Sequence, residues 1–326
     1  MRRREFVAGL VAGAATWPLA AYGQGTRKLP TVGFLYPGPP PAAVPRTEAF
    51  VNGLRAAGYR PAEQFELVSR IADGDTTRIS PFARELTELT PNVIVAVSTA
   101  AARAVRSASA TIPIIAHDLE TDPVAAGLVT SLARPGGNVT GYFLDFSEFR
   151  LKLLQLLQEV IPNLATIAVL WDPATGPSQI QSIEAGAQQL QIKLVPLEVH
   201  SPESLDAVVA AAHQRRVEAV LMLSSPMLGP NVRRLAELTL RNRLPSVTLF
   251  PEFARAGGLI AYGPNLLDTY RQVGMMVAKV LQGTQPADLP VELPTKFELV
   301  VNLTTAKAFN LPIPASILLR ADEVIE

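Results

Sequence analysis

Residues 91–117 read PNVIVAVSTAAARAVRSASATIPIIAH, and this stretch decides the fold. Val93 to Val97 is a run of β-branched and small apolar residues, as in a buried strand. Ala100 to Ser107 has the composition of a helix, and Ile112 to Ala116 is a second apolar run. A strand, a helix and another strand in succession form the unit from which helix-covered parallel sheets are built. We therefore expect an α/β fold.

The same alternation extends toward the N-terminus. Thr31 to Tyr36 and Phe65 to Ala72 read as strands, because both are short and rich in apolar or β-branched residues. Arg46 to Ala57 and Thr76 to Leu89 carry apolar residues at helical spacing. With the stretch quoted above, these elements make one half of the chain.

The second half of the chain repeats this pattern. Its expected strands are residues 139–144, 167–170, 193–199, 219–223, 246–250, 258–262 and, as the last strand, 297–302. Its expected helices are residues 148–160, 179–190, 202–213, 231–243 and 266–282. A length of 326 residues suits two domains, so we expect two Rossmann-like lobes with parallel sheets. Ligands bind beyond the carboxyl ends of such strands, so two facing sheets would enclose a binding cleft.

The composition excludes several classes of partner. Lys and Arg number 29 and Asp and Glu number 29, so no basic surplus exists to hold a nucleic acid. The chain has no cysteine, which excludes disulfides, thiolate catalysis, cysteine-ligated zinc and lipid attachment to an N-terminal cysteine. Hydrophobic residues make up 48% of the chain and charged residues 18%, which favours a packed globule.

The N-terminus reads as a targeting segment. Arg2, Arg3 and Arg4 precede a small, apolar stretch from Val7 to Ala21, which is too short to span a bilayer. Residues 1–23 are therefore predicted to be a signal peptide cleaved before Gln24, and the paired arginines favour the twin-arginine type. We expect a soluble periplasmic protein after cleavage.

Motifs of catalysis are lacking. Residues 136–141 have the glycine spacing of a phosphate loop, but Tyr142 and Phe143 stand where lysine and serine or threonine are needed. Neither G-x-G-x-x-G after a strand nor G-x-S-x-G occurs, and the three histidines lack metal spacing. His117, beside Asp118, lies at a strand end, where it could touch a ligand, but a loop histidine beside an aspartate is more often polar surface. We expect no catalytic residue, no metal and no cofactor.

Three longer stretches carry a resemblance to a known family. They are residues 122–141, DPVAAGLVTSLARPGGNVTG; residues 256–264, AGGLIAYGP; and residues 286–302, PADLPVELPTKFELVVN. On these stretches the chain resembles the ABC-transporter substrate-binding proteins whose characterised members bind tryptophan, tyrosine or phenylalanine. Residues 98–102, STAAA, are a weaker match, because the family usually has glycine where Ser98 stands. The resemblance covers nearly all of the chain after the expected signal.

The resemblance implies a type 1 periplasmic-binding architecture with three hinge crossovers, near Gly141, Tyr262 and Pro294. The lobes would then be residues 29–141 with 263–293 and residues 142–262 with 294–326. It also implies the function of a periplasmic receptor that binds a small carboxylate-bearing molecule, first of all an aromatic amino acid, for an ABC permease and its ATPase. A sensor that reports a ligand to a membrane signalling partner is the alternative. We expect a monomer.

Candidate ligand contacts lie where strands end. Ser98, Thr99 and Ala100 follow a strand and open a helix, so their amides and hydroxyls could bind a carboxylate; an ordinary helix cap is the alternative. Asp122 before Pro123 could bind an ammonium group, or could equally cap a helix.

Aromatic and hydroxyl side chains complete the expected site. Its aromatic walls are expected from Tyr36, Trp171, Phe250 and Tyr262, and its polar shell from Ser224, with Ser225 beside it. A carboxylate at a helix end contributes about 0.3 to 2 kcal/mol, whereas micromolar affinity needs about 8 kcal/mol. Burying an aromatic ring of the ligand would contribute about 4 to 6 kcal/mol, so an enclosed apolar portion is expected.

Overall fold

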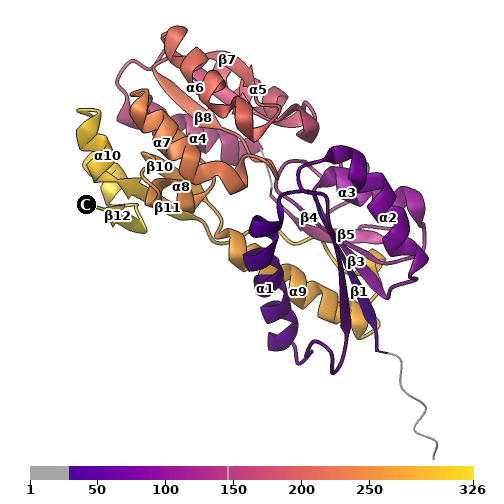
Figure 1. The fold of residues 1–326 in the computed structure, drawn as a ribbon. Helices are drawn as coiled ribbons and strands as arrows, with labels where there is room; N and C mark the ends of the chain where they lie inside the picture. The colour runs from indigo at the N-terminus through magenta and orange to yellow at the C-terminus, as the bar shows by residue number, and fades with distance from the viewer. Residues whose placement is uncertain (1–28, 145–146) are drawn as a thin grey trace, which may run out of the picture.

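A five-stranded parallel sheet forms the centre of the first lobe (Figure 1). Every residue of its strands β3, β4 and β5 is buried, because helices cover both faces. In spatial order the strands are β2 (Glu66–Ile71), β1 (Thr31–Tyr36), β3 (Val93–Val97), β4 (Ile114–Asp118) and β5 (Val139–Phe143). The computed structural model describes residues 29–144 and 147–326, so the expected signal peptide, residues 1–23, lies outside the described residues.

Two pairs of helices cover this sheet, one pair on each face. The first pair is α1 (Pro40–Ala56) with α9 (Leu266–Leu281), and the second is α2 (Ile79–Glu88) with α3 (Thr99–Ala108). Helices α1 and α9 meet at glycines: a Cβ placed on Gly274 would lie 2.2 Å from the Phe50 carbonyl oxygen. A Cβ on Gly53 would lie 2.0 Å from the Arg271 carbonyl oxygen. The missing side chains therefore allow the two helix backbones to approach closely.

The second lobe contains a seven-stranded sheet. In spatial order its strands are β12 (Glu323–Ile325), β11 (Glu298–Asn302), β10 (Ile260–Gly263), β9 (Ser246–Thr248), β8 (Ala219–Met222), β6 (Thr166–Trp171) and β7 (Lys193–Glu198). All neighbouring strands pair in parallel except β10 and β11. This pair is antiparallel because the chain enters β11 from the first lobe.

Helices also pack on both faces of the second sheet. Apolar residues of helices α4 (Ser147–Val160) and α5 (Ser178–Gln189) pack on one face of the sheet. Helices α10 (Leu303–Ala308) and α11 (Ala315–Leu318) add apolar residues to the same cluster. The other face carries α6 (Leu205–Gln214), α7 (Val232–Arg241) and α8 (Pro251–Arg255). The two lobes with their mainly parallel sheets confirm the expected α/β fold.

The chain passes between the lobes three times: after β5, after β10 and before β11. The first passage lies later than the expected boundary at Gly141, because Tyr142 and Phe143 still pair with β4. The second also lies later than Tyr262, since Gly263 pairs with Glu298 in the second sheet. The first and third passages are bonded together, because the Phe143 amide donates to the Glu292 carbonyl oxygen at 3.0 Å.

Some expected elements differ in extent. Helix α1 begins at Pro40, six residues before the expected start at Arg46, because prolines fit the first helical positions. Residues 297–302 are not the last strand, since β12 follows and pairs in parallel with β11. Helix α8 was not expected, because its five residues are too few to show a helical period.

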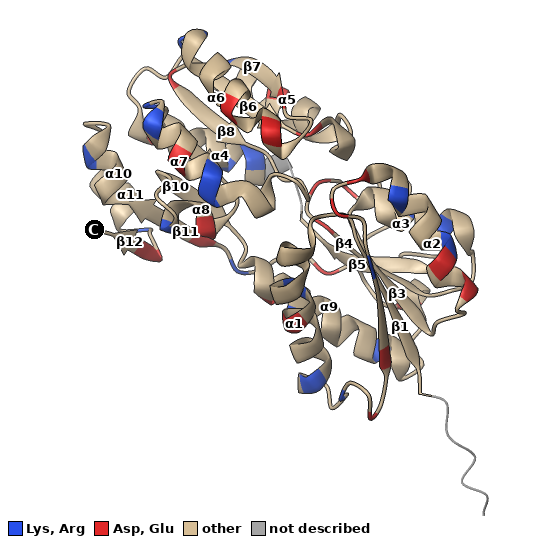
Figure 2. Ribbon diagram, viewed as in Figure 1, with Lys and Arg blue, Asp and Glu red and all other residues tan. Residues whose placement is uncertain are grey.

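Acidic and basic residues are interspersed along the elements of both lobes (Figure 2). Residues of both signs occur in each lobe in this view, in keeping with the equal numbers of acidic and basic residues. Within residues 29–144 and 147–326, the helices are too short or too polar to cross a membrane.

Candidate functional site

The carboxyl ends of strands from both lobes face each other across two cavities. Segments after β1, β3 and β4 of the first lobe, and after β6 and β8 of the second, line a cavity of about 160 Å³. A smaller cavity of about 30 Å³ lies beside it, and Glu120 and Pro226 line both. The larger volume is below the ~300 Å³ at which sites for drug-sized ligands begin, so it suits a small metabolite.

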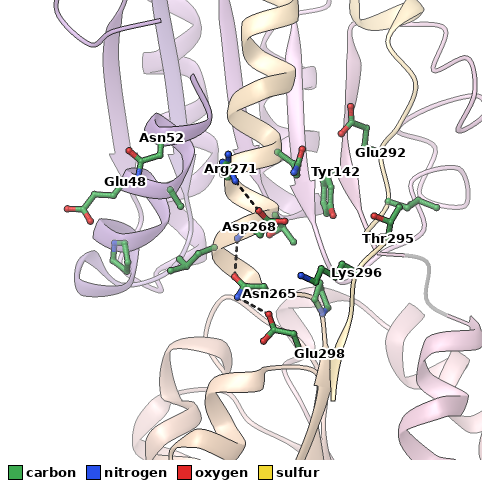
Figure 3. A pocket seen from close by; sticks show the side chains of 17 residues that line it. Glu48, Asn52, Tyr142, Asn265, Asp268, Arg271, Glu292, Thr295, Lys296 and Glu298 are labelled. Atoms are coloured by element: carbon green, nitrogen blue, oxygen red, sulfur yellow. Dashed lines mark hydrogen bonds and ion pairs between the residues drawn. The ribbon is translucent and has the colours of Figure 1, made fainter. Parts of the chain in front are cut away.

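A larger hollow lies elsewhere, beside the hinge (Figure 3). It measures about 890 Å³ and is lined by α1, the start of α9 and residues 292–298. Several of its charged groups already have partners: Asn265 Nδ2 donates to Glu298 Oε1 at 3.1 Å, and Arg271 pairs with Asp268 at 3.9 Å. Helix α3 does not reach this groove, so the cavities between the strand ends are the candidate ligand site.

Helix α3 directs its N-terminus into the larger cavity, where Ser98, Thr99 and Ala100 are in the wall. Ser98 is the N-cap, and its hydroxyl accepts a hydrogen bond from the Ala101 amide at 3.4 Å. The first amides of an α-helix have no partner within the helix, and the helix dipole makes this end positive. The amides of Thr99 and Ala100 can therefore bind an anionic group such as a carboxylate.

The Thr99 hydroxyl makes hydrogen bonds to other residues of the first lobe. It donates to Oδ2 of Asp118 and lies 2.7 Å from Oγ1 of Thr121. Because a hydroxyl has one proton, a Thr99 side chain that bonds Asp118 cannot also donate to a ligand. The interpretation of His117 as polar surface is wrong, since its exposed fraction is 3%, and the neighbouring Asp118 is fully buried.

Glu120 lies at the boundary between the lobes. Its exposed fraction is 7%, and its Oε1 accepts a hydrogen bond from the Ser224 hydroxyl of the second lobe at 2.6 Å. Burial, and next the nearby Asp118 carboxyl, raise the pKa of Glu120 well above its ordinary value. This carboxyl therefore both joins the lobes and presents an acceptor to the larger cavity.

Side chains of the second lobe hold Ser224 in place. Gln179 Nε2 donates to the Ser224 carbonyl oxygen at 2.8 Å, and the Ser224 amide donates to Gln179 Oε1 at 3.2 Å. Arg150 of α4 is buried, and its Nη2 donates to the Glu120 carbonyl oxygen at 3.5 Å. Burial lowers the pKa of Arg150 to about 9, while the Glu120 and Asp118 carboxyls act in the opposite direction. A second set of interlobe contacts thus lies beside the Glu120–Ser224 bond.

Aromatic residues line the smaller cavity. Tyr36 and Phe250 are in its wall with His117 and Tyr270, and the last two rings stack with centroids 4.1 Å apart. His117 Nε2 lies 2.8 Å from the Thr269 hydroxyl, and burial lowers the pKa of His117 to about 3. A neutral His117 therefore connects strand β4 to helix α9 near the hinge.

Three expected contacts lie outside both cavities. Asp122 is exposed, and its Oδ1 accepts from the amides of Val124 at 2.7 Å and Ala125 at 3.2 Å, so it caps a turn. Trp171 is half-buried against the core of the second lobe. Tyr262 stacks near the hinge with Phe149 and Phe297, at centroid distances of 5.7 and 5.6 Å. The structure brings together the other six: Tyr36, Ser98, Thr99, Ala100, Ser224 and Phe250.

The sequence analysis missed the polar residues after β4. Asp118, Glu120 and Thr121 converge on Thr99 and Ser224, and Glu120 and Thr121 line the larger cavity. A run of polar residues directly after a predicted buried strand was the available signal. The expected aromatic residues Tyr36 and Phe250 line the smaller cavity and not the larger one. The larger cavity has aliphatic walls instead, from residues such as Ile79, Pro226 and Met227.

Known proteins share both sequence and fold with this chain. The family model for ABC transporter substrate binding proteins matches residues 40–325. A tyrosine-binding protein of Clostridioides difficile (strain R20291) is 24% identical over 266 residues, which are 81% of this chain and 76% of the relative.

Two solved structures show the same arrangement of two lobes. A conserved domain protein from Vibrio cholerae O1 biovar El Tor is 25% identical, with a TM-score of 0.84 over 91% of this chain and 100% of its own. An ABC domain from Streptococcus pneumoniae in complex with L-Trp is 24% identical, with a TM-score of 0.82 over the same shares. The expected type 1 periplasmic-binding architecture is confirmed. Because the family model spans most of its length, the chain belongs to the ABC transporter substrate-binding protein family.

Proposed function

We propose that this chain is the receptor of an ABC importer and captures an α-amino acid with an apolar side chain between its lobes. One observation carries the ligand class: amides that suit a carboxylate and a buried carboxyl that suits an ammonium group line the same 160 Å³ cavity. The amides are those of Thr99 and Ala100, and the carboxyl is that of Glu120. An α-amino acid carries both charges a few bonds apart.

The walls of the cavity favour an apolar side chain on the ligand. Polar anchoring at a helix end contributes about 0.3 to 2 kcal/mol, so most of a micromolar affinity must come from buried apolar area. Ile79, Pro226 and Met227 provide aliphatic contact, and the flexible Met227 side chain can adapt to different shapes. The relatives named for tyrosine or solved with L-Trp make these two amino acids the first compounds to test.

The receptor would act outside the cytoplasm. After closing on the ligand, it would deliver the ligand to the permease and ATPase of the importer at the inner membrane. A protein of this family acts by binding, and the three passages between the lobes permit the hinge motion that binding needs. We propose residues 29–143 with 264–292 as one moving lobe and the rest of the described chain as the other. The monomeric state is part of the same proposal.

Calorimetry with matched compounds tests the ligand class. L-Tyrosine, L-tryptophan and L-phenylalanine are compared with the corresponding amines, which lack the carboxylate, and with N-acetyl amino acids, which lack the ammonium charge. We expect at least one free amino acid to bind and both of its analogues to bind about 10-fold or more weakly, since the amine leaves the amides at the start of α3 without an anion and the N-acetyl compound leaves Glu120 without an ammonium group. Flat titrations for all natural amino acids would overturn the proposal.

A variant at Asp122 separates the site from its surroundings. Asp122→Asn keeps an oxygen that caps the turn but removes the charge, and Asp122 lies outside the cavity. We expect its affinity for the amino acid to stay within about 2-fold of the unmodified protein.

A further inference from the structure

The larger cavity between the lobes has no aromatic wall. Among residues 29–144 and 147–326, those that line it are aliphatic, hydroxyl-bearing or charged residues and glycines. Both lobes contribute aliphatic side chains, from Ile79 at the start of α2 in the first lobe and from Ala174, Pro226 and Met227 in the second. A ligand side chain that enters this cavity therefore meets aliphatic groups and no aromatic face.

The volume of this cavity is that between two lobes in contact. The Ser224 hydroxyl of the second lobe donates to Glu120 Oε1 of the first at 2.6 Å, and Glu120 lines the cavity. In this arrangement the cavity measures about 160 Å³. An apolar cavity of about 150 Å³ holds a single benzene molecule. The charged backbone groups of an amino acid fill part of the space before its side chain is counted, so the side chain must be smaller than an aromatic ring.

The smaller cavity does not supply the missing space for a ring. It measures about 30 Å³, which is about the volume of one water molecule in the liquid. Its aromatic wall is part of the packed core, because Tyr36, Tyr270 and Phe250 are all buried and the Tyr270 ring stacks on His117. Inserting a further group into such a core forces side chains out of their preferred rotamers. An aromatic side chain of the ligand therefore has room in neither cavity.

The two largest aliphatic residues in the wall are held in place. The Met227 amide donates to Ser225 Oγ at 3.1 Å, and the Met227 carbonyl oxygen accepts from Asn231 Nδ2 at 2.8 Å, so the turn after β8 is fixed on both sides. Ile79 is buried in the apolar cluster that contains α2 and α3. These two side chains therefore limit the size of the side chain that the cavity accepts.

Besides Glu120, two charged residues line the larger cavity, and each stabilises a loop of the protein. Arg103 is exposed, and its Nη2 donates to the Ala126 carbonyl oxygen at 3.2 Å. Asp172 Oδ1 accepts from the Ala174 amide at 2.9 Å and caps the turn after β6. We therefore take the aliphatic groups, and not these two charges, as the surface that contacts the side chain of the ligand.

We propose that the receptor selects an α-amino acid with a short aliphatic side chain, in the range from alanine to leucine, isoleucine and methionine, over phenylalanine, tyrosine and tryptophan. Ile79 and Met227 are the specificity-determining residues, because they limit the cavity. This inference rests on the proposed function, since the ligand is taken to be an α-amino acid. It predicts the reverse of the preference that the relatives named for tyrosine or solved with L-Trp suggest.

Calorimetry with a graded series of amino acids tests this preference. Dissociation constants are measured for L-alanine, L-valine, L-leucine, L-isoleucine and L-methionine, for the three aromatic amino acids, and for L-glutamate and L-lysine. We expect the tightest ligand to be aliphatic and every aromatic amino acid to bind at least about 10-fold more weakly, since one methylene group in an apolar pocket already changes affinity by about 10-fold. An aromatic amino acid within about 10-fold of the best aliphatic one would overturn the inference.

Met227→Ala should shift the preference, because it widens the cavity. We expect the ratio of the Kd of L-phenylalanine to that of the best aliphatic ligand to fall about 10-fold, since the aliphatic ligand loses contacts and the ring gains space. Met275→Ala is the matched control, because Met275 is exposed on α9 outside both cavities, and the ratio should stay within about 2-fold. Ile79→Val removes one methyl group and should lower the same ratio, which keeps the test decisive if Met227→Ala does not fold. An unchanged ratio in the folded cavity variants would overturn the roles of Ile79 and Met227.

The graded series distinguishes this inference from the proposed function. Tightest binding of an aromatic amino acid would overturn the aliphatic preference and leave the amino-acid receptor intact. Tightest binding of L-glutamate or L-lysine would also overturn it and would assign the selection to the charged residues Arg103 or Asp172 of the cavity wall. Failure of every amino acid to bind would overturn the proposed function, and this inference with it.

Discussion

At Ser98 the backbone adopts φ +85° and ψ 156°, a region populated almost only by glycine. The chain accepts this conformation where β3 turns into α3, so that the helix N-terminus faces the cavity. The resemblance described in the sequence analysis implies glycine at this position, and a glycine would adopt these backbone angles without a strained Cβ. The serine adds a hydroxyl cap but keeps a strained Cβ.

Substitutions of Ser98 should separate strain from capping. Ser98→Gly removes the strained Cβ and the weak 3.4 Å cap, whereas Ser98→Ala removes the cap and keeps the strain. We expect the free energy of unfolding of the glycine variant to exceed that of the alanine variant by about 1 to 3 kcal/mol. Urea denaturation of both variants measures this difference. An alanine variant as stable as the glycine variant would show that the turn carries no strain.

Individual site residues were predictable only where local geometry decides them. Ser98 to Ala100 could be placed because a strand followed by a helix fixes where their amides point. Asp122 could not be separated from a helix cap by sequence, and the structure makes it a cap on the surface. Glu120 was missed, because its burial depends on Ser224, which is 104 residues away in the sequence.

At the scale of elements, most strands and helices could be predicted because hydrophobic periodicity reports which faces are buried. Helix α9 was placed almost to the residue, since its apolar positions recur along sixteen residues. The errors lie at the ends of helices and in the edge strand of a sheet. Helix α1 starts early because Pro40 and Pro41 act as helix starters rather than loop residues, and β12 has only three residues at the edge of its sheet.

The contact between α1 and α9 predicts opposite effects for one substitution at two sites. Gly274→Ala would place a Cβ 2.2 Å from the Phe50 carbonyl oxygen, so we expect it to destabilise the protein by about 1 to 3 kcal/mol. Gly186→Ala in α5 would place a Cβ no closer than 3.5 Å to any atom of Leu151 or Leu154, an ordinary contact, so we expect a gain of about 0.5 to 1 kcal/mol from helix propensity. Thermal and urea unfolding of both variants give the two signs. The same sign at both sites would contradict the packing argument.

At the scale of the whole molecule, closure depends on close contact between the lobes. Gly38 of the first lobe is an example: a Cβ there would lie 2.9 Å from the carbonyl oxygen of Pro226 in the second lobe. It would also lie 2.7 Å from the hydroxyl of Tyr36, which is buried and has little room to move. The sequence predicted two lobes and a cleft, but such contacts across the cleft depend on how the lobes meet.

Gly38→Ala should therefore hold the lobes apart. We expect a larger radius of gyration of the liganded protein in solution scattering and an affinity about 10- to 100-fold lower, because the closed state becomes a smaller fraction of the population. Gly137→Ala is the control, since no atom lies within 4 Å of a Cβ at that site. Closure and affinity equal to those of the control would show that Pro226 can yield to the methyl group.

The placement of α9 also governs how the protein is made. This helix covers a face of the first sheet, yet the ribosome synthesises it only after β6 to β10 of the second lobe. The sheet of the second lobe is also incomplete until β11 and β12 have been synthesised, after α9. Neither lobe can be finished as a separate unit during translation, unlike domains that fold one after another as they emerge. The nascent chain must therefore expose the apolar surface of both sheets until α9, β11 and β12 have been synthesised. A chaperone that shields this surface would act at a late stage of translation.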